Sequence, residues 1–167
     1  FTIVGKQTNE VSKILNKNIS KSKNNYFYGK NYRIIKINKK NFELKFNKKI
    51  RIISKPSLNG EFQIENSSIA IAFTEIMKNN GFKLNDKLTN KAIKDTSWPG
   101  RLEVINYKDN TIVLEGSHNI DGAKKLNQFL ETQSLKPILI FGMLNNKKID
   151  LFLKEIKENI KKLLAIN

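Results

Sequence analysis

Hydrophobic and polar positions recur with two different periods along this chain. Between residues 26 and 55, apolar side chains fall at every second position in four short runs, separated by turns rich in Asn, Lys and Gly. A period of two is typical of strands with one buried and one solvated face. The sequence therefore predicts an antiparallel meander with strands at residues 26–28, 32–37, 42–46 and 50–53, whose aromatic residues belong to the core.

Helical spacing replaces this alternation on either side of the meander. Residues 1–5 are typical of the end of a buried strand, and Thr8 is expected to cap a helix that ends near Ser20. A turn at residues 56–60 precedes a longer helix, for which Gly81 provides the C-cap, and a short helix is expected at residues 86–93. The longer helix carries an apolar stripe that predicts its buried face: Ile69, Phe73, Ile76 and Met77.

Trp98-Pro99 ends helical structure, because proline biases the residue before it toward extended geometry. Short strands follow at residues 101–105 and 111–114, then a helix capped by Asn119 or Asp121. An apolar run at residues 138–142 is typical of a parallel strand covered on both faces, and a final helix is expected from residue 149 to residue 164. The strand–helix–strand–helix order after Thr111 predicts a Rossmann-type unit with two parallel strands and an α/β fold class.

Composition narrows the class of protein. The 167 residues are 39% hydrophobic and 28% charged, and they contain no cysteine, which excludes disulfides and thiolate metal sites. No apolar run approaches the length of about 18 residues that a membrane span requires. Residues 1–5 lack the features of a signal peptide, and their entry directly on a strand indicates a piece of a larger chain. The absence of cysteine fits the cytosol, so we expect a cytoplasmic protein.

The net charge of +16 has two interpretations. A basic nucleic-acid-binding module is one, and a lysine-rich bias spread over a solvated surface is the other. Lysines occur in nearly every segment, while arginine occurs only at Arg33, Arg51 and Arg101, with no basic run interleaved with aromatics. This spread favours the solvated surface, with weak, salt-sensitive binding to polyanions and no specific nucleic-acid partner.

The chemistry concentrates in residues 97–103 and 115–119, which hold the only Trp and the only His. The second stretch follows a strand and runs into a helix N-terminus, where open parallel sheets bind ligands. Glu115 could accept the hydroxyls of a ribose, and Gly116 permits close approach of a backbone. Arg101 offers a planar fork for phosphate oxygens. His118 and Asn119 are placed to meet phosphate or base edges, although His118 could equally be a loop histidine bonded to backbone and Arg101 an ordinary surface charge.

Two further observations bear on a nucleotide site. Asn66 lies near the start of the long helix, where an exposed amide can meet a ligand or merely decorate the first turn. The phosphate loop pattern G-x-x-x-x-G-K-[ST] is absent, since neither Gly5-Lys6 nor Gly29-Lys30 completes it. Residue chemistry alone thus reaches a nucleotide-like ligand at a junction between two domains.

Four motifs in order resemble the folylpolyglutamate synthase / dihydrofolate synthase family, relatives of the Mur ligases. Members typically show Leu-x-Gly-x-His-Gln-x-x-Asn, Trp-Pro-Gly-Arg-Leu-Glu, Asp-Gly-Ala-His-Asn-Pro and Phe-Gly-Met-Leu-x-Asp-Lys-Asp. This chain matches them at residues 58–66, 98–103, 115–120 and 141–148. Departures from the family pattern fall at five positions: Phe62 for His, Glu115 for Asp, Ile120 for Pro, and Asn146 and Lys148 for the two acids of the last motif.

The resemblance implies an ATP-dependent ligase that joins L-glutamate to dihydropteroate or a folate through an acyl phosphate. It implies that Asn66 contacts adenine, Arg101 the ATP phosphates and Glu115 the ribose, with His118 and Asn119 beside the nucleotide or the incoming glutamate. ATP and Mg²⁺ are the implied cofactors, in a cytoplasmic monomer of one-carbon metabolism. No residue of this chain is assigned as catalytic or as a metal ligand.

The resemblance also implies two domains. Residues 1–97 would end a phosphate-loop ATPase domain of the Mur ligase central type, including the meander, and residues 98–167 would begin a truncated Rossmann-like C-terminal domain. Because the phosphate loop, magnesium ligands and folate pocket would lie upstream, this stretch is expected to be inactive alone. Another Mur-type amino-acid ligase and the basic nucleic-acid-binding module remain as alternatives, and the sequence leaves open which glutamate the enzyme adds.

Overall fold

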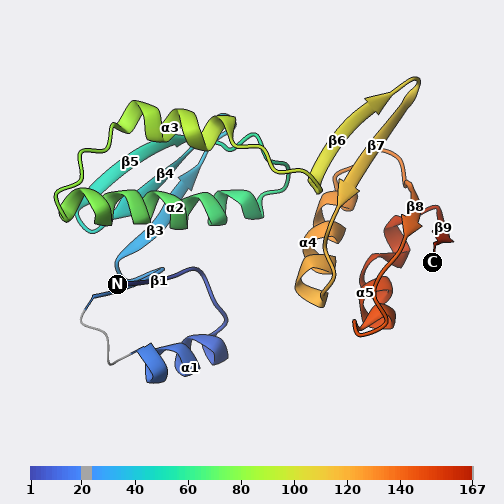
Figure 1. Cartoon of the computed structure of the whole chain (residues 1–167), viewed down its shortest axis with the longest axis horizontal. Helices are drawn as coiled ribbons and strands as arrows, with labels where there is room; N and C mark the ends of the chain where they lie inside the picture. Colours follow the sequence, from blue (N-terminus) through green and yellow to red (C-terminus); the bar gives the residue numbers. More distant parts are fainter. Residues whose placement is uncertain (20–23, 167) are drawn as a thin grey trace. The chain divides into compact units, whose positions relative to one another are not determined.

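The chain folds into two compact units, shown in a computed structural model that describes residues 1–19 and 24–166 (Figure 1). The first unit comprises Phe1–Ser57 and Glu61–Ser97, and the second comprises Leu58–Gly60 and Trp98–Asn167. Each unit mixes helices with strands, as an α/β fold requires. The assignment of residues 1–97 to an ATPase domain and of residues 98–167 to a C-terminal domain stays a prediction.

The first unit begins with a strand–helix–strand element. Strand β1 (Thr2–Val4) pairs in parallel with β2 (Asn25–Phe27), and helix α1 (Asn9–Ile19) lies between them in the sequence. The Thr8 hydroxyl accepts a hydrogen bond from the Val11 amide at 3.4 Å, so the expected N-cap is confirmed, while the expected helix end at Ser20 lies outside the described residues. The assignment of residues 26–28 to the meander was wrong, because α1 returns the chain alongside β1 and β2 pairs there instead.

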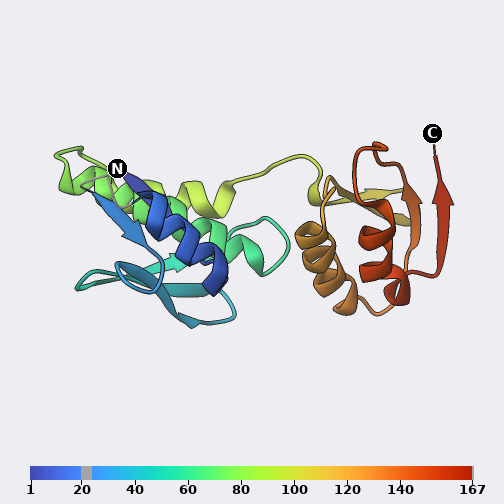
Figure 2. The ribbon, with the colours of Figure 1, turned by 90° about the horizontal axis from the view of Figure 1, so that it is seen from below.

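Three antiparallel strands form the meander: β3 (Tyr32–Ile37), β4 (Asn41–Phe46) and β5 (Lys49–Ser54). Helices α2 (Phe62–Asn79) and α3 (Asp86–Asp95) lie on one face of this sheet (Figure 2). Alternate residues of β4 point toward α2 and are fully buried, which explains the period of two in the sequence. The core between sheet and helix consists of Tyr32, Phe42, Leu44, Phe46, Ile53, Ile64, Ile71, Ala72 and Ile76.

The buried face of α2 differs from the stripe that hydrophobicity predicted. Phe73 is 45% exposed and instead contacts the Phe1 ring, with 5.9 Å between ring centroids. Two polar residues, Ser68 and Glu75, occupy the core-facing side and are almost completely buried. Both side chains form hydrogen bonds, so their burial is tolerated. A prediction that counts only apolar residues omits these two positions and therefore identifies the wrong side of the helix as buried.

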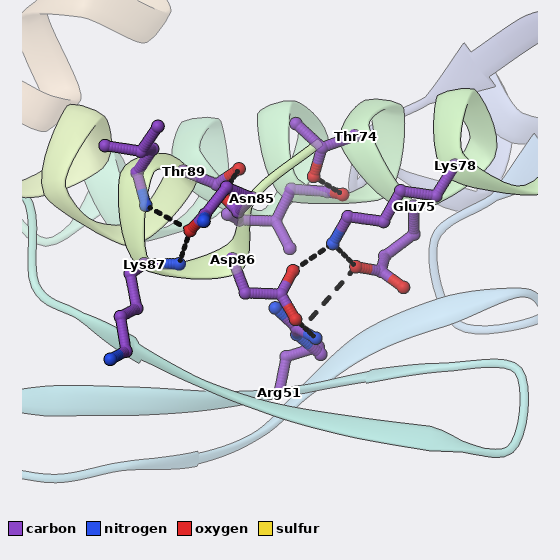
Figure 3. Close-up of polar contacts among 10 residues, drawn as sticks. Arg51, Thr74, Glu75, Lys78, Asn85, Asp86, Lys87 and Thr89 are labelled. Carbon is purple, nitrogen blue, oxygen red and sulfur yellow. Dashed lines mark hydrogen bonds and ion pairs between the residues drawn. The ribbon is translucent and has the colours of Figure 1, made fainter. Parts of the chain in front are cut away.

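Glu75 belongs to a cluster of four charged side chains that joins β5, α2 and α3 (Figure 3). Its carboxylate lies 2.8 Å from the Lys78 ammonium and 3.8 Å from the Arg51 guanidinium. Asp86, in the first turn of α3, binds both of these cations. Hydrogen bonds from Arg51 and then Lys78 lower the pKa of Asp86 to about 2. The cluster thus attaches α3 to the rest of the unit by charge as well as by the packing of Ile93.

The second unit contains a hairpin, two helices and a parallel strand pair. Strands β6 (Arg101–Tyr107) and β7 (Asn110–Glu115) form the hairpin, followed by α4 (Ile120–Glu131). Strand β8 (Ile138–Phe141), helix α5 (Ile149–Ile156), the 3-10 turn η1 (Lys157–Asn159) and β9 (Lys162–Ala165) complete it. Its buried residues are Leu102, Ala123, Leu126, Phe152 and Ile156.

The long final helix was a wrong prediction. Helix α5 ends at Ile156, and the chain then turns so that residues 162–165 form β9 in parallel with β8. The Asn159 amide donates to the Asn127 amide oxygen on α4 at 2.8 Å, which holds this turn in place. Among the described residues, β8 therefore pairs with β9 and not with residues 111–114, and its expected burial on both faces is also wrong, since Ile138 and Ile140 are exposed. Within residues 1–19 and 24–166, no helix is both long enough and apolar enough to cross a membrane.

Replacing Asp86 with Asn is expected to lower the stability of the first unit at neutral pH. Asp86 is half exposed, so its ion pairs are screened and the loss should be about 0.5–1 kcal/mol. A carboxylate whose pKa is depressed on folding stabilises above its unfolded pKa, and this contribution disappears as pH falls through the folded value. The difference between wild type and Asp86→Asn should therefore be full above pH 4 and shrink toward pH 2, as measured by urea unfolding at each pH.

Asp95→Asn is the matched control, because it removes the same charge from the other end of α3. Asp95 pairs with Lys91 on the fully exposed face, so its removal should change stability little. Equal effects of the two substitutions at neutral pH would show that the cluster does not stabilise the fold.

Candidate functional site

The turn before β6 is closed by hydrogen bonds to Gly100. Its amide donates to the Glu103 carboxylate at 2.9 Å, and its carbonyl accepts from the Gly116 amide at 2.8 Å. Gly100 has φ of +69°, a conformation that favours glycine. A Cβ on Gly116 would lie 3.4 Å from the Gly100 carbonyl oxygen, so the two segments approach closely where Gly116 was expected to allow it.

Leu102 forms a bulge in the hairpin and has a strained backbone. The register passes from Arg101 opposite Glu115 to Glu103 opposite Leu114, which leaves Leu102 without a cross-strand partner. Its φ is +50°, and a left-handed conformation costs a residue with a Cβ about 1–2 kcal/mol. The side chain is nonetheless 1% exposed, so burial of the leucine offsets this cost.

Two side chains hold the backbone of Leu102 in this conformation. The Glu115 carboxylate accepts from its amide at 2.7 Å, and the Asn59 amide donates to its carbonyl at 2.8 Å. Asn59 belongs to the segment Leu58–Gly60, which forms part of the second unit. The motif around Arg101 is therefore shaped by residues that are distant in the sequence.

Glu115 uses both carboxylate oxygens within the protein. Oε2 accepts from Leu102, and Oε1 accepts from the Ser117 hydroxyl at 2.5 Å. A carboxylate has about four acceptor sites, so capacity for a ligand hydroxyl remains. The contact with ribose stays a prediction, while the structure shows that Glu115 positions the bulge and the loop after β7.

The loop after β7 ends at the N-terminus of α4. The Asn119 side chain accepts from the Gly122 amide at 2.7 Å, which makes Asn119 the N-cap and places Asp121 in the first turn. His118 is exposed, and its Nδ1 lies 3.2 Å from the Gly116 carbonyl oxygen. A proton on Nδ1 would leave Nε2 free to accept a hydrogen bond from solvent or a ligand.

Gly122 packs tightly against this loop. A Cβ at residue 122 would lie 2.7 Å and 2.8 Å from the Ser117 side chain and 3.2 Å from the Asn119 amide oxygen. The glycine therefore allows the capping residue and the partner of Glu115 to sit against the first turn of α4.

Arg101 and Asn66 have different surroundings. Arg101 is exposed, and no carboxylate or carbonyl among the described residues binds its guanidinium. Asn66 is exposed on α2 of the first unit, where its amide donates to the buried Gln63 at 2.9 Å. Arg101, Glu115, His118 and Asn119 lie within one hairpin and the adjoining loop of the second unit, whereas Asn66 belongs to the first unit.

No role was predicted from the sequence for five residues that shape the site: Asn59, Leu102, Glu103, Ser117 and Gly122. A leucine in a strand gives no sign of positive φ, and partners such as Asn59 and Leu102 are 43 positions apart. Glu103 and Ser117 did carry a local signal, because they lie within residues 97–103 and 115–119 and their hydrogen bonds are to neighbours within three positions.

The described residues do not form a metal site. Among residues 1–19 and 24–166, no group of three His, Asp or Glu side chains could hold a metal ion. An Mg²⁺ ion held by one or two carboxylates together with a nucleotide would not require such a group.

Glu115→Ala should destabilise the second unit by about 1–3 kcal/mol, because it leaves the buried Leu102 amide without an acceptor. Urea unfolding measures this loss, and faster hydrogen exchange of the Leu102 amide locates it. Asp109→Ala, an acid in the turn of the same hairpin, is the control and should change neither quantity. An unchanged exchange rate at Leu102 in Glu115→Ala would refute the positioning role.

Gly122→Ala should displace Ser117 and weaken the Asn119 cap, at a cost of about 1 kcal/mol or more. Replacing Lys124 with Ala in the same helix provides a control at an exposed position. Circular dichroism melting compares the two, and a Gly122→Ala protein as stable as Lys124→Ala would show that the loop adapts without cost.

The chain is similar to proteins of folate metabolism. No protein-family model matches it. It is 30% identical over 77 residues to a protein of Schizosaccharomyces pombe named probable dihydrofolate synthetase, a match that covers 46% of this chain and 18% of that protein.

Solved structures resemble a larger part of the chain. A Mycobacterium tuberculosis folylpolyglutamate synthase complexed with ADP is 20% identical, with a TM-score of 0.84, over 98% of this chain and 37% of its own. A folylpolyglutamate synthase complex with AMPPCP and folate is 18% identical, with a TM-score of 0.84, over 99% and 42%. A bifunctional folylpolyglutamate synthase/dihydrofolate synthase with Mn, AMPPNP and L-glutamate bound is 18% identical, with a TM-score of 0.68, over 84% and 32%.

The chain thus spans less than half the length of each of these proteins. At sequence identities of about 20%, the structural likeness establishes only the fold. The separate sequence match is with a protein named probable dihydrofolate synthetase. The resemblance of this chain to the folylpolyglutamate synthase / dihydrofolate synthase family is therefore confirmed, and its α/β fold is that of the folylpolyglutamate synthases.

Proposed function

We propose that this chain is part of an ATP-dependent ligase that joins L-glutamate to dihydropteroate or a folate through an acyl phosphate. The exposed Arg101 guanidinium carries the proposal, because it has no partner among the described residues. Arg101 directly precedes the bulge at Leu102 and is opposite Glu115, at the start of the loop that leads to α4. The likeness to proteins whose structures contain ADP, AMPPCP with folate, or Mn with AMPPNP and L-glutamate supports the choice of ligands.

Arg101 would bind the phosphates of ATP. A guanidinium presents N–H groups in a planar fork that matches two phosphate oxygens, and it keeps its charge at any physiological pH. The position of the Arg101 backbone is fixed by its neighbour Leu102. Glu115 accepts a hydrogen bond from the Leu102 amide, and Asn59 donates one to the Leu102 carbonyl. A cation held in this way offsets negative charge on the phosphates, and its backbone does not have to move during the reaction.

The loop after β7 would contact the rest of the nucleotide. Glu115 has acceptor capacity for a ribose hydroxyl, and the N-terminus of α4 attracts an anion through its free amides and dipole. His118 and the Asn119 amide nitrogen would lie beside the nucleotide or the incoming glutamate. Asn66 of the first unit would contact adenine, and its bond to Gln63 orients the amide for that contact.

The sequence completes no phosphate loop, and no group of three His, Asp or Glu side chains among the described residues could hold a metal ion. The phosphate loop and the Mg²⁺ ligands would come from other parts of the whole protein, which we propose is a cytoplasmic monomer. Residues 1–97 would then end its ATPase domain and residues 98–167 would begin its C-terminal domain. This division explains why the chain alone is proposed to be inactive.

Arg101→Ala in the whole protein should weaken ATP binding by roughly 10- to 150-fold, as expected for loss of hydrogen bonds to a charged group. Isothermal titration with AMPPCP measures the affinity, and glutamate-dependent ADP release in the presence of dihydropteroate or a folate measures the reaction. Both should fall together.

Lys108→Ala is the matched control, because it removes a cation from the far end of the same hairpin. It should leave both affinity and turnover near wild type. Unchanged AMPPCP affinity in Arg101→Ala would exclude the phosphate role, and ADP release that does not depend on glutamate would exclude a glutamate ligase.

A further inference from the structure

A basic hollow lies on the first unit, among residues with no part in the proposed ligase site. Its volume is about 230 Å³, and its walls come from the turn before β3, the start of that strand, and the end of β4. Three of the lining side chains are cations, Lys30, Arg33 and Lys45, and none is an acid.

Two of these cations face each other across the sheet. Arg33 on β3 and Lys45 on β4 are directly opposite in the antiparallel register, an arrangement that destabilises a strand pair. The same two strands also place Lys36 opposite Glu43, with 4.0 Å between their charged groups. The sheet thus compensates a cation at one end and leaves two uncompensated at the other.

No acid relieves this repulsion within the part of the chain that the structure describes. Neither Lys30, Arg33 nor Lys45 forms an ion pair there. An anion in the hollow would offset the repulsion between Arg33 and Lys45 and would contact three cations. The hollow is therefore the place where a negative charge would be stabilised.

The walls of the hollow are held together by backbone hydrogen bonds. The Gly29 amide donates to the Tyr32 carbonyl at 2.8 Å, and the Asn47 amide donates to the Asn31 carbonyl at 2.8 Å. The Asn31 side chain accepts from the Phe27 amide at 2.9 Å. Beneath them the buried Tyr32 hydroxyl donates to the Val4 carbonyl at 2.9 Å, and burial raises the pKa of Tyr32 to about 12, so it stays protonated.

Size restricts the ligand. With a volume of about 230 Å³, the hollow is smaller than the pockets of roughly 300–1,000 Å³ that enclose a drug-sized molecule. It suits one compact, multiply charged group with partial hydration. Arginine and lysine around such a space are typical of phosphate recognition, with the guanidinium binding two oxygens and the ammonium groups acting as point charges.

We propose that this hollow binds a phosphoryl group, held by Arg33, Lys45 and Lys30, none of which belongs to the nucleotide site proposed around Arg101. Free phosphate and the terminal phosphate of a small metabolite share this chemistry. The site does not depend on the ligase assignment, because its residues belong to β3, β4 and the turn before them.

Titration of the ¹⁵N-labelled chain with inorganic phosphate tests the proposal, at constant ionic strength set with chloride. Amide signals of Gly29, Asn31, Lys45 and Asn47 should shift together and saturate. Pyrophosphate in a second titration distinguishes a terminal phosphate from the free ion by its tighter binding, and citrate provides a carboxylate of similar charge. Affinity for citrate equal to or above that for phosphate would overturn the assignment to a phosphoryl group.

Matched double variants separate a site from diffuse positive charge. Arg33→Gln with Lys45→Gln should weaken phosphate binding by roughly tenfold or more, whereas Lys39→Gln with Lys40→Gln removes two charges from the opposite end of the same strand pair and should change it less than about twofold. Equal losses in both variants would overturn the proposal.

Lys45→Glu distinguishes loss of phosphate binding from loss of the folded structure. It places an acid opposite Arg33, so it should raise the melting temperature while abolishing phosphate binding. Retained phosphate binding in this variant would also overturn the proposal.

Discussion

The geometry of the candidate site depends on one strained residue, Leu102. Its positive φ inserts a bulge into the hairpin, and this bulge changes the register directly after Arg101. The cost is offset by complete burial of the leucine and by hydrogen bonds to its amide and carbonyl. Backbone strain of this kind persists only where the surroundings over-determine it, and such positions cluster at functional sites. The strain thus shows that the surroundings fix the backbone directly after Arg101.

Acidic residues are scarce in this chain, and their positions show which contacts the fold requires. Lys and Arg number 31 against 15 Asp and Glu, so nearly any exposed acid could pair with a cation. Glu103 and Glu115 instead bind backbone amides around the bulge, and Glu75 is buried beneath two cations in the first unit. A carboxylate that accepts from a backbone amide fixes the chain, whereas an exposed ion pair contributes little. Glu103 and Glu115 thus shape the turn before Arg101 and the bulge after it.

The sequence predicted the elements whose signal is local. The period of two in β3–β5 and the caps at Thr8 and Asn119 depend on residues within a few positions of one another. The C-cap of α2 was predicted one residue too late, since Asn80 is the C-cap and Gly81 follows it with a φ of +89°. Errors arose where a distant partner decides. Residues 26–28 pair with β1 rather than the meander, and residues 162–165 pair with β8 although their apolar spacing also fits a helix. Motifs led to the prediction of Arg101, Glu115, His118 and Asn119 as site residues, which stays a prediction, whereas the bulge at Leu102 beside them has no sequence signature.

The glutamate at residue 115 also bears on how a ribose contact could coexist with the bulge. The family motif has Asp at this position, and Glu adds one methylene to the reach of the carboxylate. In this chain the longer side chain extends back across the hairpin to the Leu102 amide at 2.7 Å while its other oxygen holds Ser117. An aspartate on the same backbone would fall short of that amide by about one C–C bond, roughly 1.5 Å. The substitution is therefore coupled to the conformation of Leu102, and any ribose would meet a carboxylate already oriented by two protein donors.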